Sequence, residues 1–232
     1  MPPSKQKNGP EAEYHALIEA GELQPDAHQA NAIASLERLH HELIEYRPGG
    51  NGLLRWLGGG KPAPKGIYLY GGVGRGKSML MDLFYAVAAT PAKRRVHFHE
   101  FMLDIHTRLK VWHDLSARER AEYGRRSDGD DPIPPVARQI ANETTLLCFD
   151  ELQVTDIADA MVLTRLFKEL FTLGVVVVAT SNRPPDELYK DGLQRQRFLP
   201  FIADVKERLE VIALNGPVDY RYNRLQGAAT YY

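Results

Sequence analysis

Short apolar runs alternate along this chain with longer stretches of helical periodicity. The first run, Gly66–Tyr70, combines β-branched and aromatic residues, and the fourth, which begins at Gly174, contains four consecutive valines. Runs without polar alternation are typical of parallel strands that are covered on both faces. The predicted strands cover residues 66–70, 95–98, 144–151, 174–182 and 209–214.

Between these runs, apolar residues recur at spacings of three and four, which is the period of an amphipathic helix. Pro25 and Asp26 can open one of these helices, because both residue types favour the first helical positions. The predicted helices cover residues 11–22, a stretch of about four turns that contains Ile33, Leu36, Leu39 and Leu43, and residues 79–88, 99–112 and 157–173. The alternation predicts a doubly wound α/β core over residues 66–215.

Several segments lack either period. Residues 1–10 have no apolar signal core and are expected to form a disordered tail. Residues 47–65 are punctuated by glycine and proline, so they are expected to form a loop that completes an N-terminal helical extension over residues 11–65. Two interpretations remain open for the apolar residues of that loop, which either dock on the body or form an exposed patch for a partner. They are Leu53, Leu54, Trp56 and Leu57.

Residues 116–135 are charged and rich in glycine, aspartate and proline. They are expected to form either a solvated loop or a mobile loop that contacts a substrate. Residues 216–232 form a C-terminal tail that is rich in tyrosine and receives no assignment.

A glycine-rich stretch joins the first predicted strand to the first helix of the core. Residues 71–78 read Gly-Gly-Val-Gly-Arg-Gly-Lys-Ser, which is the pattern of a phosphate-binding loop. Glycines let the backbone turn its N–H groups inward, Lys77 reaches the outer phosphates, and the hydroxyl of Ser78 is placed to ligate Mg²⁺. The alternative is a glycine-rich turn that binds nothing. The expected nucleotide-binding residues are Gly71, Gly72, Val73, Gly74, Arg75, Gly76, Lys77, Ser78 and Met79.

Polar side chains end the third and fourth predicted strands. Asp150 is expected to hold the magnesium shell together with Ser78, and Glu151 to orient or deprotonate the attacking water. Asn182 stands where open α/β sheets bind ligands, and it is expected to hydrogen-bond the γ-phosphate or the water. The alternatives are a helix cap for either carboxylate and a turn for Asn182.

Other polar residues have weaker signals. Arg195 and Arg197 end a predicted helical piece before Pro200, and either can stabilise charge in a neighbouring subunit's site or form a surface ion pair. Asp26 or Gln29 is expected to border the adenine, with simple packing as the alternative.

Composition narrows the picture. The 232 residues are 44% hydrophobic and 25% charged, with a net charge of −1, so this is an ordinary globular composition without the basic surface of a general nucleic-acid binder. The single cysteine, Cys148, is expected to be inert core. His97 and His99 are predicted to share one side of a strand, but no further ligand completes a metal cluster. No apolar run is long enough to span a membrane, although peripheral association with one stays open.

Taken together, the motifs resemble the ZapE cell-division ATPases, which are bacterial relatives of the mitochondrial AFG-one-type ATPases within the AAA+ superfamily. The resemblance covers roughly residues 15–225. It rests on Tyr-Leu-Tyr-Gly-Gly-Val-Gly-Arg-Gly-Lys-Ser and on the segments that begin at Phe98, Leu147, Ala179 and Gly192.

The resemblance implies an AAA+ core with a five-stranded parallel sheet in the order 5-1-4-3-2. It also implies that Asn182 is the sensor on the fourth strand. Arg197 becomes the first candidate for an arginine finger, and Arg195 the second. AAA+ modules carry a helical lid after the last strand, and the sequence ends at Tyr232, so the expectation is either that the chain is a fragment or that the lid is absent.

The function implied by the resemblance is Mg²⁺-dependent ATP hydrolysis coupled to remodelling of a protein partner, the ring protein FtsZ. Self-association into a ring and a cytoplasmic location at the division site are implied as well. Three alternatives stay open from the residues: a nucleotide-gated scaffold with little turnover, a phosphate-loop kinase and a helicase-loader-like ATPase. The near-neutral charge weighs against the last.

Overall fold

A five-stranded parallel sheet forms the centre of the molecule. The computed structural model describes residues 9–48, 62–123 and 129–215. The strand order is β2-β3-β4-β1-β5, which is the predicted order read from the other edge, so that prediction is confirmed. The strands are β1 (Gly66–Tyr70), β2 (Lys93–His97), β3 (Leu146–Asp150), β4 (Val176–Ser181) and β5 (Leu209–Ala213).

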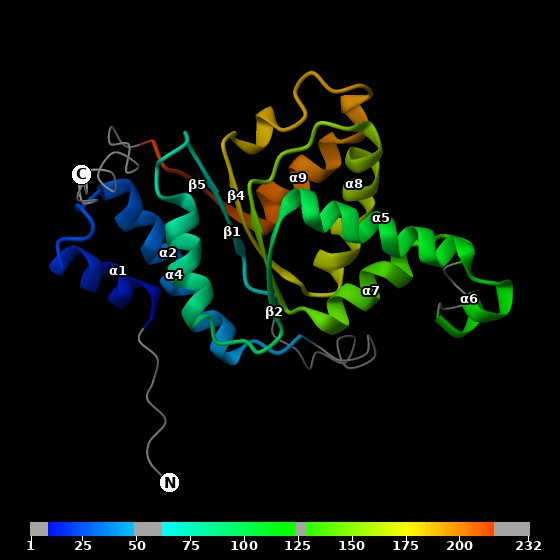
Figure 1. Cartoon of the computed structure of the whole chain (residues 1–232), viewed down its shortest axis with the longest axis horizontal. Helices are drawn as coiled ribbons and strands as arrows, with labels where there is room; N and C mark the ends of the chain where they lie inside the picture. Colours follow the sequence, from blue (N-terminus) through cyan, green and yellow to red (C-terminus); the bar gives the residue numbers. More distant parts are fainter. Residues whose placement is uncertain (1–8, 49–61, 124–128, 216–232) are drawn as a thin grey trace, which may run out of the picture.

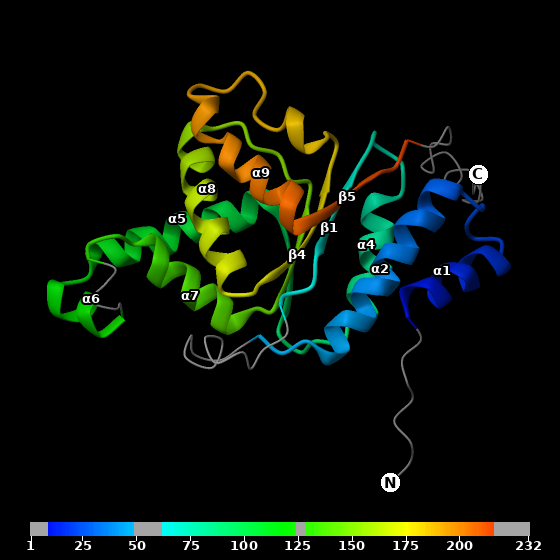
Figure 2. The ribbon, with the colours of Figure 1, turned by 180° about the vertical axis from the view of Figure 1, so that it is seen from behind.

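Helices cover both faces of this sheet (Figures 1 and 2). One face carries α1 (Pro10–Glu19), α2 (Ala27–Glu45) and α4 (Lys77–Val87). The other carries α5 (Phe98–Asp114), α7 (Ile133–Glu143), α8 (Ile157–Thr172) and α9 (Leu199–Arg208). The short α6 (Ala117–Tyr123) lies at the outer end of α5 (Figure 1).

Alternation along the central strands divides the core into two layers. On β3, Leu146 and Cys148 pack with the α1, α2 and α4 layer, whereas Leu147 and Phe149 pack with the α5 to α9 layer. All four are fully buried, as expected for a strand covered on both faces. Cys148 is therefore core, as predicted, and burial raises the pKa of its thiol to about 12.

The helix predicted to open at Pro25 and Asp26 is confirmed. Asp26 is the N-cap of α2, and its Oδ1 accepts hydrogen bonds from the backbone N–H groups of His28 (2.7 Å) and Gln29 (3.0 Å). None of the helices within the described ranges has the length and apolar character needed to cross a membrane.

The prediction of a loop over residues 116–135 is wrong in part. Residues 117–123 form α6, and α7 already begins at Ile133. Pro134 and Pro135 read as breakers in the sequence, but proline is well suited to the first turn of a helix, where its missing N–H has no partner to lose. Residues 124–128 lie outside the described residues, as do residues 1–8, 49–61 and 216–232, and with them the four apolar residues of the glycine-rich loop.

The helical piece predicted to end at the arginines before Pro200 is present as a 3₁₀ helix over Arg195–Arg197, and Pro200 itself lies in the first turn of α9. Another local prediction is wrong. His99 does not alternate with His97 on a strand, because β2 ends at His97 and α5 begins at the next residue. Within the ranges given above, no three His, Cys, Asp or Glu side chains gather as a metal-binding group.

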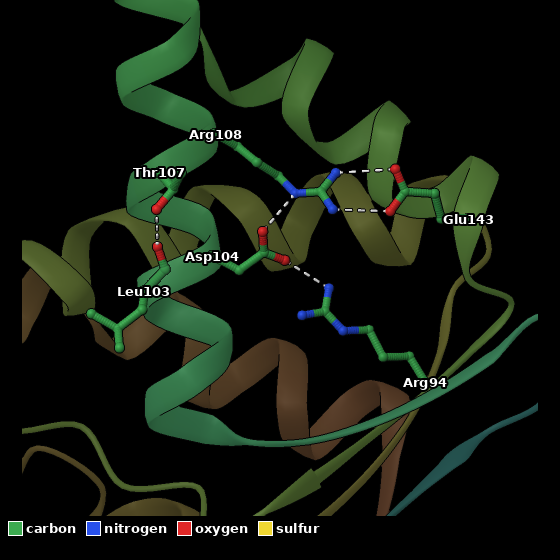
Figure 3. Close-up of polar contacts among 6 residues, drawn as sticks. All are labelled: Arg94, Leu103, Asp104, Thr107, Arg108 and Glu143. Carbon is green, nitrogen blue, oxygen red and sulfur yellow. Dashed lines mark hydrogen bonds and ion pairs between the residues drawn. The ribbon is translucent and has the colours of Figure 1, made fainter.

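An ionic chain fixes α5 to its neighbours (Figure 3). Asp104 of α5 accepts hydrogen bonds from Arg94 of β2 (2.7 Å) and from Arg108 (3.0 Å), and Arg108 also donates to both carboxylate oxygens of Glu143 on α7. Burial alone would raise the pKa of Asp104, but the hydrogen bonds from the two arginines outweigh it and lower that pKa.

Replacing Asp104 tests whether this chain stabilises the fold. We expect Asp104→Asn to lower the free energy of unfolding at pH 7 by about 1–2 kcal/mol, because two arginines lose a charged acceptor. A carboxyl whose pKa is depressed in the folded state contributes stability above its unfolded pKa and loses it as the pH falls through the folded value. The difference from the native chain should therefore shrink below about pH 4.

The measurement is urea denaturation followed by circular dichroism between pH 7 and pH 3.5. Thr107→Ala is the matched control, since Thr107 lies on the same helix, is exposed and donates its hydroxyl to the carbonyl of Leu103 in its own helix (Figure 3). It should change stability by less than about 0.5 kcal/mol. Equal stability of Asp104→Asn and the native chain at pH 7 would contradict the assignment.

Candidate functional site

The loop between β1 and α4 tolerates only glycine at two positions. Gly76 precedes α4 with a φ of 85°, and a Cβ there would lie 2.7 Å from Nε2 of Gln29. A Cβ on Gly71 would lie 2.4 Å from the backbone oxygen of Leu214. The close approach of the backbone at Gly71 and the left-handed conformation at Gly76 therefore determine the shape of the loop. The loop ends at the N-terminus of α4.

Lys77, the first residue of α4, joins the loop to the end of β4. Its Nζ donates hydrogen bonds to the carbonyls of Gly71 (2.7 Å) and Gly72 (2.8 Å) and to Oδ1 of Asn182 (2.9 Å). Burial lowers the pKa of this ammonium; the charge of Glu151 opposes that shift, and the charge of Arg75 adds to it. Three residues predicted separately, in the loop and at the ends of two strands, thus meet in one electrostatic environment.

The carboxyl end of β3 presents two carboxylates in different surroundings. Asp150 is 5% exposed; its Oδ2 accepts a hydrogen bond from Nε of Arg95 (2.7 Å), whereas its Oδ1 is buried without a partner among the described residues. Glu151 is exposed and adopts a left-handed φ of 56°. That conformation is uncommon outside glycine and clusters at functional sites.

The end of β4 supports this turn. The backbone N–H of Glu151 donates to Oγ1 of Thr180 (3.0 Å), and the N–H of Leu152 donates to the carbonyl of Thr180 (2.7 Å). Ser181 donates its hydroxyl to the carbonyl of Leu152 (2.8 Å). These contacts hold the left-handed residue in place and direct its side chain towards solvent.

The site has the oxygen donors that a magnesium ion requires. Ser78 lies in the first turn of α4 with an exposed side chain, and the unpartnered Oδ1 of Asp150 is a buried acceptor on the same side of the sheet. Hydroxyl and carboxylate oxygens are the ligands that Mg²⁺ prefers. The residues therefore fit the metal, which Ser78 and Asp150 would hold.

Comparison with known proteins identifies the family. The sequence profile described as AFG1-like ATPase matches residues 8–232. The chain belongs to the AFG1-like ATPase family. It is 41% identical to the cell division protein ZapE of Escherichia coli K12 over 230 residues, covering 94% of this chain and 58% of ZapE. It is 52% identical to lactation elevated protein 1 homolog B of Danio rerio over 170 residues, covering 73% of this chain and 33% of that protein.

Solved structures agree on the fold. The crystal structure of DnaI matches with a TM-score of 0.55 at 17% identity, over 95% of this chain and 94% of that chain. Domain III of the replication initiation protein DnaA from Thermotoga maritima matches with a TM-score of 0.53 at 18% identity, over 84% of this chain and 66% of that chain. The fold is that of AAA+ proteins. The AFG1-like chain spans between a third and three fifths of the length of the two curated relatives.

The two arginines predicted as fingers differ in their contacts. Both lie in the short 3₁₀ helix η3 (Arg195–Arg197) that leads into α9. Arg195 donates through Nη2 to the carbonyl of Asp186 (2.6 Å), so it is engaged within its own chain. The side chain of Arg197 is exposed. The structure brings neither arginine into contact with Lys77 or Asn182 of the same AFG1-like chain.

Asp26 and Gln29, predicted beside the adenine, have different places. Asp26 caps α2, and its place beside the adenine stays a prediction. Gln29 is 1% exposed, and its Nε2 donates to the carbonyl of Arg75 in the phosphate-binding loop (3.2 Å), while its Oε1 is buried without a partner among the described residues. The N-terminal extension of this AFG1-like chain therefore contacts the loop directly.

A cavity of about 440 Å³ opens beside Glu151 and Asn182. It lies at the carboxyl ends of β3 and β4, where open α/β sheets bind ligands. Its walls are residues 151–155, 181–183 and 188–192, so the segment after the third strand and the segment after the fourth form it together.

Sequence reasoning missed Arg95 and Thr180 as parts of the site. Arg95 lies on β2 directly beside Cys148 in the register of β3, two positions before Asp150. The sequence shows a charged residue within the second predicted strand, but not that this strand pairs with the strand that ends in Asp150. Thr180 near the end of β4 is a small polar residue without a pattern of its own in the sequence.

Substitution of Gly76 tests the contact between the extension and the loop. We expect Gly76→Ala to lower the free energy of unfolding by about 2–4 kcal/mol, from the left-handed backbone and from the clash with Gln29. Gly21→Ala is the control, because Gly21 has a φ of 74° and no atom within 4 Å of the added carbon. It should cost only the backbone strain, about 1 kcal/mol. If chemical denaturation gives equal losses in the free energy of unfolding for Gly76→Ala and Gly21→Ala, the contact between Gln29 and the loop is contradicted.

Proposed function

We propose that this chain binds a nucleoside triphosphate with Mg²⁺ and hydrolyses it, and that hydrolysis remodels a protein partner. The observation that carries the proposal is the Lys77 ammonium, which is held by the loop carbonyls and by Asn182 and interacts electrostatically with Glu151. Membership of the AFG1-like ATPase family supports the same activity.

Each residue has a defined task in this proposal. The N–H groups of residues 71–79 and the ammonium of Lys77 bind the β- and γ-phosphates. Gln29 holds the loop in place through its hydrogen bond to the carbonyl of Arg75. Glu151 accepts a proton from the attacking water, and Asn182 orients that water and the γ-phosphate. When bound through Ser78 and Asp150, magnesium supplies polarisation of the phosphoryl oxygens.

The proposal includes an arginine supplied by a neighbouring subunit. Arg197 suits this role better than Arg195, because its guanidinium is exposed whereas Arg195 is bound to Asp186. An arginine finger stabilises charge as it develops on the transferred phosphoryl group. Hydrolysis would then require self-association, as in a ring.

The partner and location are proposed from the relatives. One relative is named a cell division protein, so we propose an FtsZ-like division protein as the partner and the cytoplasmic side of the division site as the location. The chain corresponds to 58% of that relative, and the proposal therefore concerns the nucleotide-binding part of the activity first.

Two substitutions separate binding from turnover. Lys77→Ala removes the cation that faces the phosphates, and we expect ATP affinity measured by calorimetry with Mg²⁺ to fall at least about tenfold. Glu151→Gln keeps the shape of the site but removes the base. It should bind ATP within about threefold of the native chain while phosphate release falls by about 100-fold or more.

Phosphate release and affinity are measured on the same preparations. Native chain that binds ATP but releases no phosphate at any concentration would favour the nucleotide-gated scaffold. Phosphate transfer to an added acceptor instead of water would favour a kinase. Absence of ATP binding by the folded native chain would refute the proposed function.

A mixing experiment tests the shared site. Arg197→Ala subunits lack the finger and Glu151→Gln subunits lack the base, so each alone should be nearly inactive. Mixed subunits should recover activity, because some sites then combine an intact Glu151 with an intact Arg197 from the neighbour. Specific activity of the native chain should also rise with protein concentration.

Arg208→Ala is the matched control, since Arg208 is an exposed arginine at the end of α9. It should retain the activity of the native chain. Flat specific activity across a wide dilution series, or no recovery in the mixture, would exclude a finger supplied in trans.

A further inference from the structure

The guanidinium of Arg95 lies between two carboxylates at the corner where α4 meets β2 and β3. Its Nε donates to Oδ2 of Asp150 (2.7 Å), and its Nη1 contacts Oδ1 of Asp82. Asp82 lies on α4 and is more than half exposed, whereas the Asp150 side chain is 7% exposed. Arg95 therefore connects the phosphate-loop helix to the carboxylate expected to serve the metal.

This arrangement follows from the register of the sheet. Arg95 is paired with Cys148, so its side chain and that of Asp150 are on the same face, two positions apart. Cys148 packs in the layer that contains α4, and Asp82 is one helical turn beyond Ser78. The pairing of β2 with β3 and the helical period of α4 thus place Arg95 on the same face of the sheet as Asp150 and Ser78, the residues expected to hold the metal.

Asp150 needs a positive charge nearby before any metal binds. A carboxylate removed from water is strongly disfavoured unless it is paired. Lys77 does not fill this role, because its ammonium donates to the carbonyls of Gly71 and Gly72 and to the amide oxygen of Asn182. Arg95 supplies the charge and binds only one carboxylate oxygen, which leaves Oδ1 with no partner among the described residues.

An incoming polyphosphate makes the same charge more important. Bound phosphates would lie at the N-terminus of α4, near Asp150. At the effective dielectric constant of a protein, the repulsion between two like charges about 6 Å apart lowers the affinity for the phosphates by on the order of a hundredfold. Mg²⁺ removes this repulsion when it is bound. Without the metal, Arg95 is the group in contact with Asp150 that can reduce it.

We propose that Arg95 is the counter-cation of Asp150 in the metal-free site, so that the site accepts nucleotide before the metal. By holding Oδ2, the same contact positions Asp150 with Oδ1 directed to the metal shell. Arg95 is thus a positioning residue that acts through Asp150. This inference rests on the proposed function, because it requires that the site bind nucleotide and that Asp150 serve the metal.

The test is ADP affinity by calorimetry, once in EDTA and once in saturating Mg²⁺. Arg95→Gln should lose about tenfold or more in EDTA and less than about threefold in Mg²⁺, because the metal takes over the neutralisation of Asp150. Arg94→Gln is the matched control: it removes the same charge from the same strand, but Arg94 pairs with Asp104 of α5 and not with Asp150 (Figure 3). It should change neither affinity by more than about threefold.

Two more variants separate charge from folding. Arg95→Lys keeps the charge and should retain ADP affinity in EDTA within about threefold. In the Asp150→Asn background the buried charge is gone, so adding Arg95→Gln should no longer lower ADP affinity in EDTA. The comparison between Asp150→Asn and the double variant remains valid even if Arg95→Gln alone does not fold. Thermal unfolding of each variant shows whether it is folded.

The outcomes distinguish this inference from the proposed function. Equal losses for Arg95→Gln in EDTA and in Mg²⁺, the same behaviour as Arg94→Gln, or a tenfold loss that persists in the Asp150→Asn background would each overturn the role of Arg95. Failure of the native chain to bind ADP in either buffer would instead overturn the proposed function.

Discussion

The contact of one buried ammonium with two strand ends is the interaction on which the site depends. Lys77 can reach Asn182 only because β1 and β4 are neighbours in the sheet, although 105 residues separate the two side chains in the chain. The crossover that brings β4 next to β1 places the phosphate-binding loop and Asn182 at one edge of the sheet. The carboxylates of β3 join them because β3 pairs with the other side of β4.

The apolar sheet gives this cluster its rigidity. The interior positions of β3 and β4 are fully buried between two helical layers, so polar side chains appear where the strands end. Each end is then fixed by contacts to its neighbour: Thr180 holds the left-handed Glu151, and Arg95 holds Asp150. A site built on strand ends in this way keeps its donors and acceptors in place without a bound ligand.

Much of this was predictable from the sequence, for reasons that differ between elements. The phosphate-binding loop and the apolar strands have local signals, and the strand order came from the family resemblance. Proline was misread at α7, and α9 was not predicted after Pro200, because the same residue that breaks a helix interior suits its first turn. The pairing of Arg95 with Asp150 had no local signal: 55 residues separate them, and a charged residue in a strand at the edge of the sheet reads as solvent-exposed. Registers of this kind are fixed only by the folded sheet.

A crystal structure of the chain with Mg²⁺ and a non-hydrolysable ATP analogue tests the central claim most directly. The account predicts that the β- and γ-phosphates lie against the N–H groups of residues 71–79, with Lys77 Nζ bonded to phosphate oxygens. Asn182 should face the γ-phosphate, and the metal should lie between Ser78 and Asp150. Analogue bound elsewhere, or bound here with Lys77 contacting no phosphate oxygen, would contradict it.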